Sequence, residues 1–257
     1  MSEERHGQSW LTLDVAVFVF LACAITWSAA FLRSTYDAPI GLVVKYGPSL
    51  AGVIATALFA GRRGLLELVR RLSPFRARPH WIAFAVILPV LLGAVTLGAR
   101  ALFFGPVPSV PGLGVLGSLG IFGGELSLRF FAGGGLGEEL GWRGFMLPRM
   151  LERCGWLRAS IWVGVCHGLW HAPAQGPAVL VLTFYTVGGA IVFTWMAGRT
   201  GGSIFLAALL HASGNATLFS IERIWPELDN DLTVQMSFLL LWWVVAGALI
   251  MRTGRDG

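Results

Sequence analysis

Long apolar segments recur along the whole chain, and they constrain its fold more than any other feature. A bilayer core of about 30 Å is crossed by about 20 helical residues. Eight segments are long enough to do so, at about residues 14–32, 40–60, 81–104, 116–147, 158–176, 177–198, 203–220 and 234–251. Only 13% of the residues are charged, whereas soluble domains have about 25%. The sequence therefore predicts an all-α integral membrane protein with about eight transmembrane helices, in which residues 1–257 form one polytopic domain.

Arginines concentrate in the connection between the second and third segments and predict the orientation of the chain. This connection contains Arg62, Arg63, Arg70, Arg71, Arg76 and Arg78. By the positive-inside rule it is cytoplasmic, so both termini are expected inside and the connections at 172–176 and 222–231 outside. The net charge of +5 is then a topology signal, and no nucleic-acid partner is predicted. Residues 64–75 form either a short helix on the anionic leaflet or a plain charged loop.

The fourth segment, 116–147, is too long for a simple span. As a straight helix it would extend about 46 Å, so it must tilt, break or protrude. Glycine weakens a helix and permits close approach of backbones. We therefore predict a break at the run Gly133, Gly134, Gly135 and Gly137.

Two adjacent carboxylates follow this glycine run. Neighbouring helical residues differ by about 100° in direction, so Glu138 and Glu139 are expected to face different sites. Glu139 and Arg143 have the spacing of an ion pair along one helix face, which leaves Glu138 free to face a reaction centre. The alternative is that both carboxylates are structural. Glu125 and Arg129 have the same four-residue spacing and are interpreted as a helix-stabilising pair.

Three histidines also lie in apolar segments. His167 and His171 are four residues apart on one face, where they either bind a metal or bond to neighbouring helices. Pro173 is expected to end or kink that helix. His211 and Asn215 share another face, where the Asn amide either donates to an oxyanion or links helices.

Depth in the membrane indicates that these groups meet. Counted from the predicted cytoplasmic ends, Glu138 and His211 each lie about 15 Å inside the bilayer, and His171 is slightly deeper. Ionisable groups in a membrane are functional candidates by default. The sequence therefore predicts one active site in the membrane core, accessible from the cytoplasmic side, within a catalytic core of about 116–220.

The motifs EELGWR, WHAP and HASGN resemble a known family. In this order and spacing they are similar to the EExxxR, FxxxH and HxxxN motifs of the CAAX protease and bacteriocin-processing (CPBP) family, which includes type II CAAX prenyl endopeptidases. The resemblance implies that Glu138, His171, His211 and Asn215 are catalytic and that Arg143 supports the site through Glu139. His167 stands where the family has Phe. It either adds a ligand or proton relay or merely repacks the cavity wall, and we favour the repacked wall.

The resemblance implies an intramembrane endopeptidase. In the favoured mechanism Glu138 and His171 activate water while His211 and Asn215 stabilise the oxyanion, and no cofactor is required. In the second, His171 and His211, with His167 as a further candidate, bind a zinc ion that polarises the water, and Glu138 is either the general base or another ligand. The expected partners are the lipid bilayer and a membrane-bound or lipidated peptide. No oligomeric state is predicted.

Two other classes of function compete with the peptidase. In a proton-coupled transporter, Glu138, His171 and His211 would form a proton relay. In a non-catalytic scaffold for bacteriocin immunity, the same fold would persist without chemistry. The amide of Asn215 beside His211 has no special purpose in a relay, so we favour the enzyme.

Overall fold

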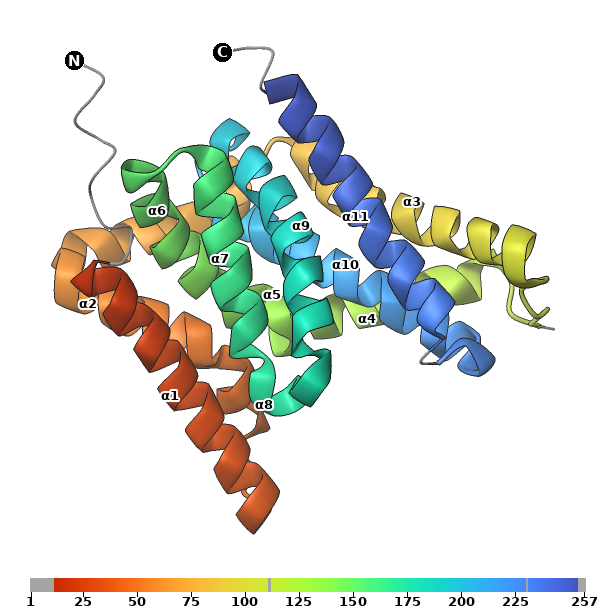
Figure 1. Cartoon of the computed structure of the whole chain (residues 1–257), viewed down its shortest axis with the longest axis horizontal. Helices are drawn as coiled ribbons and strands as arrows, with labels where there is room; N and C mark the ends of the chain where they lie inside the picture. The colour runs from red at the N-terminus through yellow and green to blue at the C-terminus, as the bar shows by residue number, and fades with distance from the viewer. Residues whose placement is uncertain (1–11, 111, 230, 254–257) are drawn as a thin grey trace.

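The computed structural model describes residues 12–110, 112–229 and 231–253, and helices dominate these ranges (Figure 1). The elements are α1 (Leu13–Tyr36), α2 (Gly41–Leu72), η2 (Pro74–Arg76), α3 (Pro79–Phe104), α4 (Val115–Ala132), α5 (Gly134–Glu139), η3 (Leu140–Met146), α6 (Leu147–Arg153), α7 (Trp156–Trp170), α8 (Ala172–Gln175), η4 (Gly176–Ala178), α9 (Val179–Arg199), α10 (Ile204–Ile224), η5 (Pro226–Leu228) and α11 (Leu232–Thr253). The described residues contain no strand. The predicted all-α multi-pass membrane fold is confirmed. Both chain ends, predicted cytoplasmic, lie outside the described residues.

Seven helical stretches in the described residues are long and apolar enough to cross a membrane, and the segment predicted at 158–176 differs from them. It forms α7, which has 15 residues and ends at Trp170. Pro173 lacks the backbone N–H that would continue the helix, and its ring would clash with the carbonyl of Leu169. At 1.5 Å per residue α7 extends about 22 Å, so it is shorter than the bilayer core.

The predicted break in the fourth segment occurs at Gly133, whose backbone is extended between α4 and α5. Beyond α5 the chain widens into the π-helix η3 before α6 begins. A π-turn within a helix is often found at functional sites. Arg71 binds two backbone carbonyls of η3: its Nη1 donates to Gly144 O at 3.0 Å and its Nη2 to Arg143 O at 2.9 Å.

The helix α2 holds the broken segment in place. Ser49 Oγ donates to Leu136 O at 2.7 Å, and Tyr46 donates its hydroxyl to Phe131 O. A methyl group at Gly52 would come within 2.7 Å of the Cα of Gly141, so the two backbones approach closely, as small residues permit in membranes. The carboxylates of α5 are thus fixed by backbone contacts on one side.

After Gly61, where φ is 58°, the chain of α2 continues as a helix to Leu72. The segment 64–75 is therefore mainly helical, rather than a plain charged loop. Only glycine adopts such a φ readily, which explains why the helix changes direction there.

The helix α10 lies at the centre and packs against α3, α4 and α5 (Figure 1). A second contact joins α7 to α9, where Thr186 Oγ1 donates to Gly164 O at 2.9 Å. Buried apolar residues form three clusters in the described part of the chain, and two of these are large. One surrounds Phe18 and Trp142, and the other surrounds Phe238 and Trp242. Polar residues of α5, α7 and α10 line a common cavity, whose apolar wall includes residues of the second large cluster.

Candidate active site

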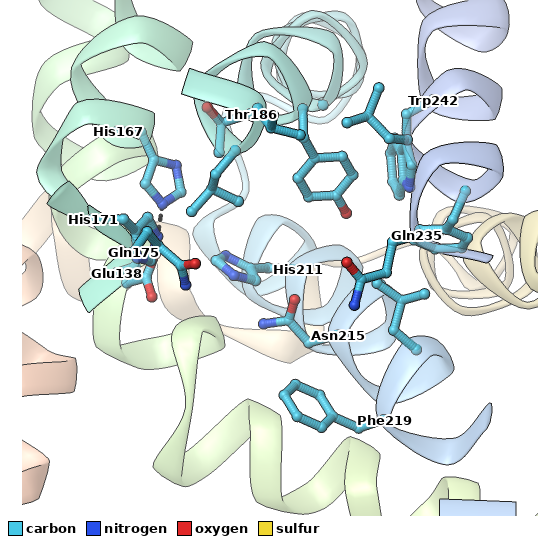
Figure 2. Close-up of a pocket in the computed structure, with 18 of the residues that line it drawn as sticks. Glu138, His167, His171, Gln175, Thr186, His211, Asn215, Phe219, Gln235 and Trp242 are labelled. Atoms are coloured by element: carbon cyan, nitrogen blue, oxygen red, sulfur yellow. Dashed lines mark hydrogen bonds and ion pairs between the residues drawn. The ribbon is translucent and has the colours of Figure 1, made fainter. Parts of the chain in front are cut away.

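The structure brings the predicted polar residues together from three parts of the chain (Figure 2). Glu138 comes from α5, His167 from α7 and His171 from the turn after α7, while His211 and Asn215 come from α10. All five line one cavity of about 480 Å³. Glu138 and His167 are buried, and the other three are half-buried.

Glu138 is held by His167. Its Oε2 lies 2.6 Å from His167 Nε2, and the Nδ1 of the same ring lies 3.4 Å from Arg143 Nη1. A guanidinium can only donate, so Nδ1 is the acceptor and the ring proton is on Nε2, from which it is donated to the carboxylate. His167 is therefore not merely a repacked part of the cavity wall, as favoured from the sequence. It orients the Glu138 carboxylate.

Glu139 faces another direction and makes different bonds. Its Oε1 accepts from Arg143 Nη1 at 2.8 Å and lies 2.7 Å from His211 Nδ1. The carboxylate has no exposed surface, and its Oε2 has no hydrogen-bond partner among the described residues. The predicted Glu139–Arg143 ion pair is thus present, and it extends to His211.

Gly134 lies between the two polar sides of the site. A methyl group at this position would lie 2.9 Å from Glu138 Oε1 and would also overlap His211 Nε2. Both atoms therefore border the space above Gly134. Asn215 lies one helical turn beyond His211 and points into the cavity (Figure 2). No hydrogen bond to Asn215 occurs within the described part of the chain.

His171 caps the end of α7 and packs on aromatic neighbours. Its ring centroid is 4.5 Å from that of Trp170 and 5.5 Å from that of His167. Ligand atoms of His171, His167 and Glu138 all lie within 4.8 Å of one another. One carboxylate and two imidazoles are a donor set that suits zinc. This set contains His167 in place of the predicted His211, whose Nδ1 faces Glu139.

The hydrogen bonds bear on whether a metal fits. Zinc binds the unprotonated nitrogen of a neutral imidazole, whereas the contact with Arg143 leaves the proton of His167 on the nitrogen that faces Glu138. A metal bound by this nitrogen would have to displace that proton and the Arg143 contact. Glu138, His167 and His171 are of residue types that suit zinc. Their hydrogen bonds in this structure, however, position the Glu138 carboxylate without a metal.

The cavity extends from this site toward one end of the bundle. Gln175 of α8, Glu222 near the end of α10 and Gln235 near the beginning of α11 line its outer part. These residues adjoin the connections that the arginine distribution predicts to be outside. Sequence reasoning did not single out Gln175 or Gln235. Their polar side chains at the borders of apolar segments were the available signal.

Comparison with known families supports the resemblance seen in the motifs. Residues 125–217 match the family model described as type II CAAX prenyl endopeptidase Rce1-like. The matched range contains Glu138, His167, His171, His211 and Asn215 and confirms the predicted family resemblance for this part of the chain. No curated protein matches the chain.

The buried ion pair gives a prediction for stability. Replacing Arg143 by Met leaves the Glu139 carboxylate without its guanidinium partner, and breaking a buried pair in this way costs about 3–5 kcal/mol. We therefore expect Arg143→Met to lower the midpoint of thermal unfolding of the detergent-solubilised protein. The double variant Glu139→Gln/Arg143→Met should recover a large part of the loss.

The control for this experiment is the exposed pair of Arg70 and Glu67, 3.8 Å apart. Exposed pairs contribute about 0–1 kcal/mol, so Arg70→Gln should leave the midpoint nearly unchanged. Equal effects of the Arg143 and Arg70 variants would contradict the assigned importance of the buried pair.

Proposed function

Because residues 125–217 match an Rce1-like family model, we propose that this chain is an intramembrane endopeptidase that hydrolyses a peptide bond of a membrane-bound or lipidated peptide. One observation carries the proposal. Atoms of Glu138 and His171 lie within 4.8 Å of each other on one side of a membrane cavity that His211 and Asn215 also line. A water molecule that bonds to two groups at ordinary hydrogen-bond lengths holds them about 4.5 Å apart.

Glu138 acts as the general base in the proposed first step. A water held between Glu138 and His171 loses a proton to the carboxylate as its oxygen attacks the scissile carbonyl carbon. His167, bonded to Oε2, keeps the carboxylate in one orientation, so that Oε1 is the oxygen bordering the space above Gly134. The proton held by Glu138 is then transferred to the leaving amine as the C–N bond breaks.

His211 and Asn215 stabilise the tetrahedral oxyanion in this scheme. His211 faces Glu139 through Nδ1, so Nε2 donates a hydrogen bond only when the ring carries both protons. The Glu139 carboxylate compensates that positive charge. Asn215 supplies a neutral amide donor without a bonding partner among the described residues. Removing one such donor typically costs about 10²–10³ in kcat.

Zinc is the alternative source of an activated water. Glu138, His167 and His171 are the residues that would hold it, and the ion would lower the pKa of its bound water. The Arg143–His167–Glu138 chain of hydrogen bonds favours the mechanism without metal, which was also the one favoured from the sequence.

The apolar lining of the cavity supports a peptide substrate that is embedded in lipid. Its walls are largely apolar, with Leu182, Phe219 and Trp242 around the polar centre. A lipid-anchored or membrane-bound peptide reaches such a site more easily than a soluble one does. A prenylated CAAX tail and a bacterial leader peptide both meet this description.

The first test removes the proposed base. Glu138→Gln keeps the size of the side chain but cannot accept the proton, so cleavage should fall by about 10²–10⁴-fold. The measurement is mass spectrometry of peptides from isolated membranes that contain the wild-type or the variant protein. A product present only with wild type identifies the substrate, and its persistence with a chelator is expected for the metal-free mechanism.

The matched control is Glu67→Gln, the same substitution at an exposed carboxylate, which should leave the product unchanged. Thermal unfolding of both variants shows whether each is folded. Identical peptide profiles for wild type and a folded Glu138→Gln protein would refute the peptidase. Loss of gradient-driven flux in the same variant would then favour the transporter, and no change in either assay would favour the scaffold.

The role of His167 gives a second prediction. His167→Phe installs the residue usual in the family and removes the bond to Glu138. A hydrogen bond to a charged group contributes about 1.5–3 kcal/mol, so kcat should fall about 10–100-fold. KM should change little, because His167 positions the base and does not bind the peptide. An unchanged kcat would show that the Glu138 carboxylate needs no such support.

The direction of access is the third point to test. The cavity reaches Gln235, next to a connection predicted outside, whereas the sequence also predicted access from the cytoplasm. If the site is entered at Gln235, the arginine-based orientation and the prediction of cytoplasmic access contradict each other. With the native cysteines replaced, we expect Gln235→Cys to react with an impermeant maleimide from the non-cytoplasmic side and Arg63→Cys from the cytoplasmic side. The reverse pattern would restore cytoplasmic access and overturn the arginine-based orientation.

A further inference from the structure

Five arginines line a second cavity at the opposite helix ends from Gln235. This cavity has a volume of about 510 Å³ and lies between the end of α2, the beginning of α3 and the turn from α9 to α10. The arginines are Arg70, Arg71, Arg76, Arg78 and Arg199. Among the lining residues that the structure describes, Glu67 alone is acidic. The cavity therefore has a large excess of positive charge.

One arginine is fixed in place and the others are mostly uncompensated. Arg71 donates from Nε to Gly202 O at 2.8 Å, in addition to its bonds to the backbone of η3. Arg70 pairs with Glu67 at 3.8 Å. Arg76, Arg78 and Arg199 have no acidic partner within the described residues. Like charges that line one cavity repel, and an anion between them would relieve the repulsion.

The beginning of α10 borders the same cavity through Ser203 and Leu206. The Ser203 side chain accepts from Leu206 N at 3.3 Å, and its carbonyl accepts from Ala207 N at 3.2 Å. The N–H groups of Ile204 and Phe205 have no partner within the helix. The positive end of this 21-residue helix thus points toward the arginines, an arrangement that favours phosphate.

We propose that this cavity binds the phosphate group of an anionic phospholipid. Arginine presents its N–H groups in a planar fork that matches phosphate oxygens. Phe75, 97% exposed next to Arg76, and Trp81 in the cavity wall are suited to the interface where headgroups meet acyl chains. The positive-inside rule places these helix ends at the cytoplasmic leaflet, whose lipids include anionic ones.

The experiment measures lipid binding to the full chain in detergent by native mass spectrometry. Phosphatidylglycerol should bind more tightly than phosphatidylcholine, which has the phosphate but no net charge. The double variant Arg78→Gln/Arg199→Gln should weaken phosphatidylglycerol binding about thirtyfold, from the loss of two charges near the headgroup. The control Arg62→Gln/Arg63→Gln removes the same charge from exposed positions outside the cavity and should change binding less than about threefold.

Equal weakening in the two double variants, or equal binding of the two lipids to wild type, would overturn the proposed site. A third arm uses inorganic phosphate as competitor. Failure of millimolar phosphate to displace phosphatidylglycerol supports a lipid ligand. If inorganic phosphate instead displaces phosphatidylglycerol from the wild-type protein at a concentration below the one at which the lipid binds, the lipid assignment would be overturned. A soluble phosphate would then be the ligand of these arginines.

Discussion

The site depends on the carboxylate of Glu139, which is buried in the interior of a membrane protein, where a charge is costly. Glu139 has no exposed surface, and taking a charge out of water costs several kcal/mol unless partners compensate it. Arg143 and His211 supply that compensation through a single oxygen, and so join η3 to α10. Glu138, one residue earlier, is thereby left to face the cavity. The division of roles between two adjacent carboxylates follows from this buried ionic centre.

Much of the fold could be predicted because a bilayer translates apolar length directly into helices. The glycine run marked the break before α5, and the four-residue spacing marked the pairs Glu139–Arg143 and Glu125–Arg129, both of which are present. Hydropathy overestimated the length of the helix that became α7. The predicted segment continued to residue 176, whereas α7 ends at Trp170 and the next residues form the separate short helix α8. The π-helix η3 was not predicted from the sequence, and Arg71, which donates to two of its carbonyls, is distant from it along the chain.

The residues of the candidate site could be predicted from the sequence, but the hydrogen bonds between them could be predicted only in part. Helical spacing places His167 and His171 on one face, yet it does not specify which neighbouring helix supplies their partners. The direct bond of His167 to Glu138 therefore could not be read from the sequence. The same limit applies to the candidate metal ligands, among which His167 takes the place expected for His211. The contact between His211 and Glu139 is a relation between α10 and α5 that no motif records.

The shortness of α7 has a consequence for the lipid around the protein. This helix exposes Ile161 and Leu169, yet its length is about 8 Å less than an ordinary hydrocarbon core. Hydrophobic mismatch of this kind is relieved when the surrounding bilayer thins. The thinned annulus would lie beside His167 and His171. Under the proposed peptidase function, a substrate peptide that approaches there would cross less hydrocarbon, so the thinned membrane would lower the barrier to bringing a polar backbone to the cavity.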